Sequence, residues 1–196
     1  MKTLLRIDSS FKSDKSFSRM MSDYFVKCWQ TENPNGKILY RDLDVEVVLP
    51  LTSKTYTAFY TNVNADGCLG VSDALIDELK AADEILISSP VFNYSVPSNL
   101  KAYIDQIVRI NRTFEYDMET GERSGLLNGK KASVIVSRGG KEDVDGVEKY
   151  LSGVLNYIGI TNVQEFSISG TVYQDVDERI VKVKKDIKSK FDKVLL

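Results

Sequence analysis

Serine and lysine side chains dominate the stretch Ser9–Ser18, which separates an apolar run, Thr3–Ile7, from a helical pattern that starts near Ser18. A loop between a strand and a helix N-terminus can bind phosphate, because backbone N–H groups and the positive end of the helix dipole face it. Serine hydroxyls add donors, and Lys12 and Lys15 add positive charge. The stretch is therefore a candidate phosphate site. The alternative is that its serines only cap the helix and solvate the turn.

The absence of histidine narrows the chemistry further. It excludes Ser-His-Asp and Cys-His catalysis and any metal site with histidine ligands. Catalysis must then rest on carboxylates, Tyr, Lys, Arg, backbone donors or a bound cofactor. A bound cofactor suits a loop that holds phosphate.

Length and composition predict one globular domain over residues 1–196, since 42% of the residues are hydrophobic and 28% are charged. A net charge of −2 gives no support for nucleic-acid binding. Arg6 and Asp8 interrupt the N-terminal apolar run, so we expect no signal peptide. No apolar stretch approaches the roughly 20 residues of a membrane span. Cys28 and Cys68 form no C-x-x-C pair, which favours a reduced cytoplasmic protein.

Strand and helix patterns alternate along the chain and predict its architecture. The predicted strands are residues 2–8, 37–43, 84–90, 131–137 and 163–168. Helical spacing of apolar residues begins near Ser18, near Ser72 and at Pro97, and then covers 147–159 and 176–187. Five β-α units indicate a parallel sheet with helices on both faces. We expect an α/β three-layer sandwich with strand order 2-1-3-4-5, whose ligand site lies beyond the C-terminal ends of the first and third strands.

Two segments depart from this alternation. Asp44–Gly70 has a weak pattern that Pro50 interrupts, and it is longer than most connections in compact domains. We interpret it as a lid or as part of a subunit interface. Arg112–Asn128 contains Thr113–Tyr116 and then a Thr-Gly pair, which predicts a small hairpin.

Three loops should meet at one edge of this sheet: Ser9–Ser18, Pro90–Tyr94 and Ser137–Gly140. The second has an aromatic residue on either side of Asn93, and the Gly-Gly pair of the third permits close backbone approach to a ligand. A planar aromatic cofactor with a phosphate tail fits these features, and flavin mononucleotide (FMN) has that shape. Taken singly, the aromatic residues could pack internally, the glycines could form an ordinary turn, and Arg138 could be a solvated surface charge.

With these motifs in place, the chain resembles the FMN-dependent NADH:quinone oxidoreductase and azoreductase family of bacteria over essentially its full length. The resemblance implies a flavodoxin-like fold. The motifs that carry it are Ser9-Ser10, Ser16-x-Ser18 before Ser22-Asp23-Tyr24-Phe25, Pro90-x-Phe92-Asn93-Tyr94-Ser95-x-Pro97-x-x-Leu100-Lys101, Thr113-Phe114-x-Tyr116, Gly129-Lys130-Lys131, Ser137-Arg138-Gly139-Gly140 and Tyr157-Ile158-Gly159-Ile160.

The resemblance also assigns roles to residues. The residues implied to hold the FMN phosphate are Ser10, Ser16, Phe17 and Ser18. Those implied to line the isoalloxazine are Val91, Phe92, Asn93, Tyr94, Ser137, Arg138, Gly139 and Gly140. Tyr116 and Tyr157 match positions that line the substrate pocket. The family commonly has Met-Tyr-Asn-Phe where this chain has Val-Phe-Asn-Tyr, which changes the polarity beside the ring and bears on substrate preference.

As for activity, the resemblance implies that NADH or NADPH passes a hydride to flavin N5 and leaves, after which a quinone or an aromatic azo compound receives the electrons. This is a ping-pong reaction in which quinones are reduced by two electrons and azo compounds are cleaved to amines. The chemistry belongs to the flavin, so neither a catalytic side chain nor a metal is needed. The family implies a homodimer whose subunits share each site, with small-molecule substrates and neither a nucleic-acid nor a membrane partner.

Three other functions on such a sheet stay open at this point. A flavodoxin-type electron carrier is usually strongly acidic, which this chain is not. A phosphoacceptor receiver domain needs an aspartate at the end of the third strand; Asp8 is present on the first strand, but the third ends Ser88-Ser89-Pro90. Hydrolysis of acyl carrier protein needs an activated nucleophile, and serine lacks a histidine partner here.

Overall fold

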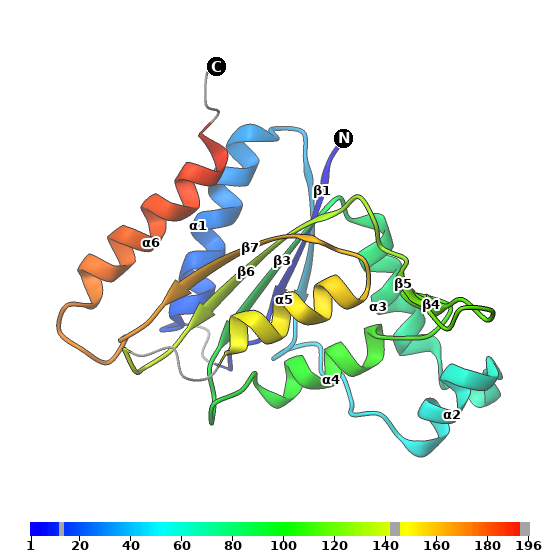
Figure 1. Cartoon of the computed structure of the whole chain (residues 1–196). Helices are drawn as coiled ribbons and strands as arrows, with labels where there is room; N and C mark the ends of the chain where they lie inside the picture. Colours follow the sequence, from blue (N-terminus) through cyan, green and yellow to red (C-terminus); the bar gives the residue numbers. More distant parts are fainter. Residues whose placement is uncertain (12–13, 142–145, 193–196) are drawn as a thin grey trace.

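Strands and helices alternate along the computed structural model, which describes residues 1–11, 14–141 and 146–192 (Figure 1). The elements are β1 (Thr3–Asp8), α1 (Phe17–Glu32), β2 (Lys37–Asp42), α2 (Ser53–Thr61), the 3₁₀ turn η1 (Ala65–Gly67), α3 (Gly70–Ala81), β3 (Glu84–Pro90), α4 (Ser98–Ile107), β4 (Phe114–Tyr116), β5 (Arg123–Gly125), β6 (Lys131–Ser137), α5 (Val147–Tyr157), β7 (Asn162–Ile168) and α6 (Val176–Phe191). The predicted α/β alternation is confirmed.

The main sheet has five parallel strands in the order β2-β1-β3-β6-β7. By label this is 2-1-3-6-7 rather than the predicted 2-1-3-4-5, because the separate hairpin β4–β5 adds two strands between the third and fourth strands of the sheet. Asp8 pairs with Ser88, and Pro90 pairs with Ser137. The C-terminal ends of β1, β3 and β6 therefore share one edge of the sheet, as the three loops require.

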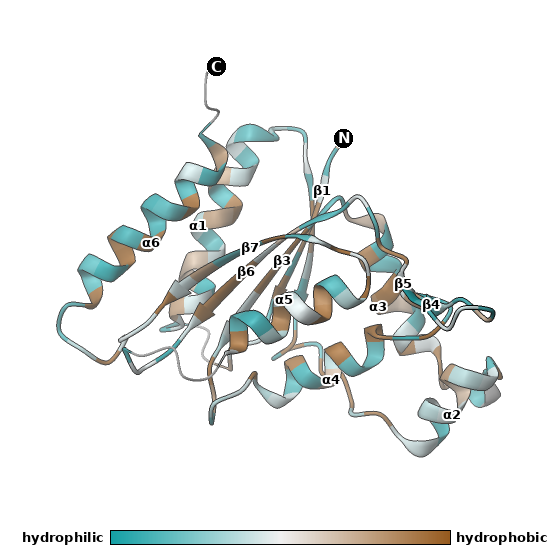
Figure 2. Ribbon diagram, viewed as in Figure 1, coloured by the Kyte–Doolittle hydropathy of each residue, from teal (hydrophilic) through white to brown (hydrophobic). Residues whose placement is uncertain are grey.

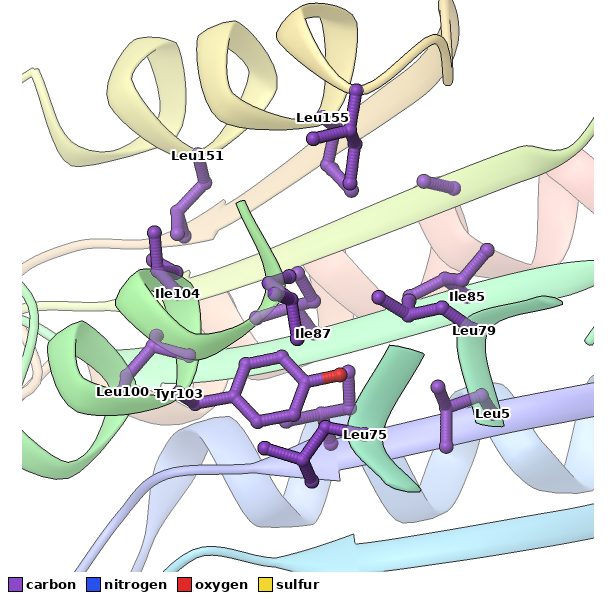
Figure 3. Packing of buried hydrophobic residues seen from close by; sticks show 14 of the residues in the cluster. Leu5, Leu75, Leu79, Ile85, Ile87, Leu100, Tyr103, Ile104, Leu151 and Leu155 are labelled. Carbon is purple, nitrogen blue, oxygen red and sulfur yellow. The ribbon is translucent and has the colours of Figure 1, made fainter. Parts of the chain in front are cut away.

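Helices cover both faces of this sheet (Figure 1). On one face α3, α4 and α5 enclose the larger apolar core, where Leu75, Tyr103 and Leu151 pack with Leu5 and Ile87 of the strands (Figure 3). On the other face α1 and α6 enclose a second core. The central strands are apolar, whereas α6 shows both hydrophilic and hydrophobic residues along its length, as an amphipathic helix does (Figure 2). All of β3 is buried, which explains the apolar run Ile85–Ile87 at its centre.

The segment Asp44–Gly70 contains more regular structure than its pattern predicts. Helix α2 lies within it, and the Thr52 hydroxyl caps this helix by accepting a hydrogen bond from the Thr55 backbone N–H at 3.2 Å. Tyr56, Phe59 and Tyr60 do follow helical spacing, but one short run of aromatic residues does not distinguish a helix from a loop.

Smaller differences concern element boundaries. Helix α3 begins at Gly70, two residues before the predicted Ser72. Pro97 is the residue before the first turn of α4 and not the first helical residue that its fixed φ suggests. The predicted hairpin within Arg112–Asn128 is confirmed by the antiparallel pairing of β4 with β5.

The described residues contain neither a membrane-spanning helix nor a metal-binding cluster. None of their helices is long and apolar enough to cross a membrane. Among the same residues, no group of three or more Cys, Asp or Glu side chains is arranged to hold a metal ion.

Candidate functional site

Three consecutive carbonyl groups, at the last residue of β1 and the first two residues of the loop that follows it, are each engaged by another part of the protein. Their partners are the Leu43 amide for Asp8 (2.9 Å), the Asn99 side chain for Ser9 (3.2 Å) and the Arg19 guanidinium for Ser10 (2.7 and 3.2 Å). The C=O and N–H of a trans peptide point in opposite directions. The Ser9 and Ser10 carbonyls therefore turn the N–H groups of Ser10 and Phe11 to the opposite side.

The same loop ends at the N-terminus of α1. Ser16 is the N-cap: its hydroxyl accepts a hydrogen bond from the Arg19 backbone N–H at 3.2 Å and lies 3.1 Å from the Ser18 hydroxyl. The capping role is thus confirmed for Ser16. The first turn of a helix offers further N–H groups and a positive dipole, so capping and anion binding are compatible. Lys15 is exposed, and Lys12 lies outside the described residues.

The loop after β3 is a strained tight turn. Phe92 and Ser95 exchange two backbone hydrogen bonds of 2.9 and 3.0 Å across it. Between them, Asn93 and Tyr94 both have left-handed backbones, with φ of 51° and 64°. Such conformations cost energy in residues other than glycine and cluster at ligand sites. The turn leaves Tyr94 75% exposed, whereas Phe92 stacks on Phe11 of the first loop, with ring centroids 5.9 Å apart.

Arg138, in the loop after β6, is not the surface charge that one interpretation of the sequence suggests. Only 4% of it is exposed, and its guanidinium donates hydrogen bonds to the hydroxyls of Ser167 (2.7 Å) and Ser169 (3.1 Å). It also forms an ion pair with the buried carboxylate of Glu148. Glu148 therefore balances the charge of Arg138 inside the protein, and these contacts give the Arg138 side chain a structural role.

A fourth loop, which the sequence analysis missed, braces this third one. The backbone N–H groups of Gly170 and Thr171, after β7, donate to the carbonyls of Gly140 (2.6 Å) and Arg138 (3.1 Å). A Cβ on Gly140 would meet nothing within 4 Å, and one on Gly139 would lie 3.4 Å from Val172. The topology could have revealed this brace, because β7 ends at the same edge of the sheet. Asn99 was missed as well, since its sequence context gives only a helix start.

Tyr116 and Tyr157 come together, but not beside these loops. Their hydroxyls lie 3.4 Å apart, and the ring of Phe114 meets that of Tyr157 at 4.9 Å. Tyr157 is the last residue of α5, a helix of 11 residues that starts near the loop after β6. It therefore lies about 16 Å along the helix from that loop. Figure 1 shows the hairpin β4–β5 at this same far end. Burial raises the pKa of Tyr157, and its hydrogen bond with Tyr116 adds to the rise.

Asp8 lies beneath the first loop and is fully buried. Its carboxylate accepts hydrogen bonds from the hydroxyls of Ser88 (2.6 Å) and Tyr40 (3.1 Å) and from Arg6 (2.9 Å). A phosphoacceptor aspartate must be reachable by its phosphate donor. The burial of Asp8 therefore argues against a receiver domain. Its hydrogen bonds indicate a structural role beneath the loop.

Comparison with known proteins identifies relatives of this chain and structures with the same fold. A family model described as "flavodoxin-like fold" matches residues 1–191. An FMN-dependent NADH:quinone oxidoreductase of Acidobacterium capsulatum is 36% identical over 183 residues, which cover 87% of each chain. A protein of the same name from Cellvibrio japonicus is 34% identical over 195 residues, covering 95% of this chain and 97% of that one.

Solved structures share the fold. The crystal structure of an azoreductase from Bacillus anthracis superposes with a TM-score of 0.88 at 20% sequence identity, covering 98% of this chain and 99% of the other. At that identity the likeness concerns the fold alone.

Proposed function

The chain belongs to the family of FMN-dependent NADH:quinone oxidoreductases, and from this premise we propose that its three loops bind FMN and that NADH and a quinone react there in turn. It is an enzyme of this kind, with FMN as its cofactor and NADH as the electron donor. One observation carries the assignment of the site, namely that three features share one edge of the sheet. They are the N-terminus of α1 behind a loop whose Ser9 and Ser10 carbonyls are engaged by other side chains, the strained turn after β3, and the loop after β6 with open space at Gly140.

The phosphate would lie against the loop between β1 and α1. Ser10, Ser16, Phe17 and Ser18 are the residues that we propose to hold it. The N-cap at Ser16 fixes where the first helical turn begins, and this turn directs N–H groups and dipole charge toward an anion. The carbonyls of Ser9 and Ser10, which would repel a phosphate, are engaged elsewhere.

The isoalloxazine would lie between the other two loops, residues Val91–Tyr94 and Ser137–Gly140. The open space at Gly140 lets the backbone approach a flat ring, and the loop after β7 keeps that backbone in place. When bound, FMN supplies the hydride and electron transfer. The chain itself binds and orients the cofactor, offers backbone donors near Asn93 and Gly139 to developing charge, and needs no side-chain nucleophile.

The substrates of this site are proposals. We infer that quinones are reduced by two electrons, that aromatic azo compounds are cleaved to amines, and that donor and acceptor occupy the same place in a ping-pong order. Initial rates at several concentrations of NADH and of a small quinone test the order. Parallel lines in double-reciprocal plots are expected, and intersecting lines would contradict it.

A homodimer would complete the substrate pocket. Tyr116 and Tyr157 lie far from the cofactor loops of their own chain, so they can line the pocket only if a second subunit presents them. Tyr56 and Tyr60 of α2 are 55% and 60% exposed, and with Phe114 they border a hollow of about 160 Å³. This aromatic surface gives the segment Asp44–Gly70 a role at the interface. Sedimentation analysis should show a dimer, and a monomer with full activity would contradict this arrangement.

Purified protein tests the function as a whole. We expect flavin absorbance, or its recovery on adding FMN, and NADH-dependent reduction of a small quinone without any partner protein. Turnover that requires a partner protein would favour the electron-carrier alternative. Colourless protein that FMN cannot reconstitute would contradict both.

A further inference from the structure

Arg19 uses its whole guanidinium to connect the first loop to the sheet. Its side chain is 9% exposed although it lies in the first turn of α1. Nε and Nη2 donate to the Ser10 carbonyl at 3.2 and 2.7 Å, and Nη1 and Nη2 donate to the two carboxylate oxygens of Asp42 at 2.6 Å each. Nη1 also donates to the Tyr40 hydroxyl at 3.0 Å. These contacts use all the N–H donors of a guanidinium, so its orientation is fixed.

Arg19 contacts the loop from the N-terminal end of α1, the helix into which this loop leads. Asn99, which engages the neighbouring Ser9 carbonyl, comes instead from α4. Arg19 thereby fixes the plane of the Ser10–Phe11 peptide, with its C=O toward the guanidinium and its N–H away from it. A peptide turned the other way would present a carbonyl dipole to an anion.

The charge of Arg19 is already balanced where it lies. The bidentate contact with Asp42 is the largest cause of the lowered pKa of Asp42, and Asp8 lies 3.8 Å from Nη1. Because the charges of Arg19 and Asp42 largely cancel, this ion pair contributes little electrostatic potential at a phosphate on the far side of the loop. The orientation of the peptide is the remaining way in which Arg19 can influence an anion.

We propose that Arg19 is a positioning residue for the FMN phosphate: it touches no phosphate oxygen, and it acts by holding the Ser10–Phe11 peptide so that the Phe11 N–H faces the phosphate. The inference rests on the proposed function.

Riboflavin separates this role from a general effect on folding, since it has the ring of FMN without the phosphate. Dissociation constants for FMN and riboflavin are measured by the change in flavin fluorescence, for the wild type and for Arg19→Lys and Arg19→Gln. Both variants lose the planar fork, and only the second loses the charge. We expect each to bind FMN about tenfold more weakly or worse and riboflavin within about twofold of the wild type.

Arg41→Lys is the matched control. Arg41 lies on β2 beside Asp42, is 16% exposed, and pairs with Glu46 and Glu78 rather than with the loop. Like Arg19→Lys, this substitution keeps the charge and loses the guanidinium fork of a comparable ion pair, and the preference for FMN over riboflavin should stay unchanged. If neither Arg19 variant folds, Tyr40→Phe removes one acceptor of the guanidinium without changing any charge, and the preference should fall about threefold.

Two results would overturn the inference. One is an unchanged preference for FMN in Arg19→Lys, or in Tyr40→Phe where that variant carries the test; if Arg19→Gln then shows a loss, charge and not peptide orientation matters. The other is an equal loss in Arg41→Lys. A wild type that binds neither flavin would instead contradict the proposed function, and the inference would fail with it.

Discussion

Replacing Ser16 with Asp tests the phosphate end of the site without removing the helix cap. The Ser16 hydroxyl accepts a hydrogen bond from the Arg19 backbone N–H, and an aspartate at this position can do the same. Asp, Asn and Ser are similarly good N-caps, so the helix should keep its stability. What changes is that a carboxylate stands where a phosphate would bind.

The expected magnitude follows from the burial of the site. Ser16 is 8% exposed, so the new charge lies in a medium of lower dielectric than water. Two unit charges about 5 Å apart repel by about 0.8 kcal/mol in water and by about 3 kcal/mol at an effective dielectric constant of about 20. Since a phosphate monoester carries more than one charge near pH 7, a loss of at least about 1.4 kcal/mol is expected, which is about tenfold in affinity.

The assay is a fluorescence titration with FMN and with riboflavin. Ser16→Asn is the matched control, because it differs from the aspartate by charge and keeps the cap. We expect Ser16→Asn to bind FMN within about threefold of the wild type and Ser16→Asp to bind it at least about tenfold more weakly, with riboflavin unaffected. Unchanged FMN affinity in a folded Ser16→Asp variant would show that the phosphate lies elsewhere.

Other predictions concern the parts around this loop. Phe11→Ala should weaken FMN binding by about 0.5–1.5 kcal/mol in the same titration, because the stacked pair that joins two loops is lost. Glu148→Gln should lower the free energy of unfolding by about 3 kcal/mol in urea, followed by tryptophan fluorescence, since it breaks a buried ion pair with Arg138. Asp42→Asn should destabilise most above about pH 5, and its effect should shrink as pH falls. The hydrogen bond from Arg19 lowers the folded-state pKa of Asp42, so the stabilisation from this carboxylate is lost as pH falls through that pKa. A destabilisation by Asp42→Asn that is independent of pH would contradict the last prediction.

The fold was predictable because its signals are local and repeated. The buried strand β3 contains the apolar run Ile85–Ile87, and helix α1 shows its apolar rows in sequence. Once the alternation is recognised, topology brings the ends of β1, β3 and β6 together. The hairpin was also visible from its turn residues.

The parts that sequence reasoning missed depend on contacts between distant residues. The sequence around Arg138 does not predict its ion pair with Glu148. It also does not predict the hydrogen bonds from Gly170 and Thr171 that hold the loop in place. The contact of Arg19 with Ser10 is of the same kind, because it depends on Asp42 of a different strand. Helix α2 was missed for another reason: its apolar run is too short for periodicity alone to identify.

The position of FMN tests the central claim most directly, and a crystal structure of the protein with FMN would show it. We predict the phosphate within hydrogen-bond distance of the backbone N–H groups at Ser16–Ser18 and the ring between residues 91–94 and 137–140. A flavin bound at another edge of the sheet, or in the reverse orientation along these loops, would contradict the account.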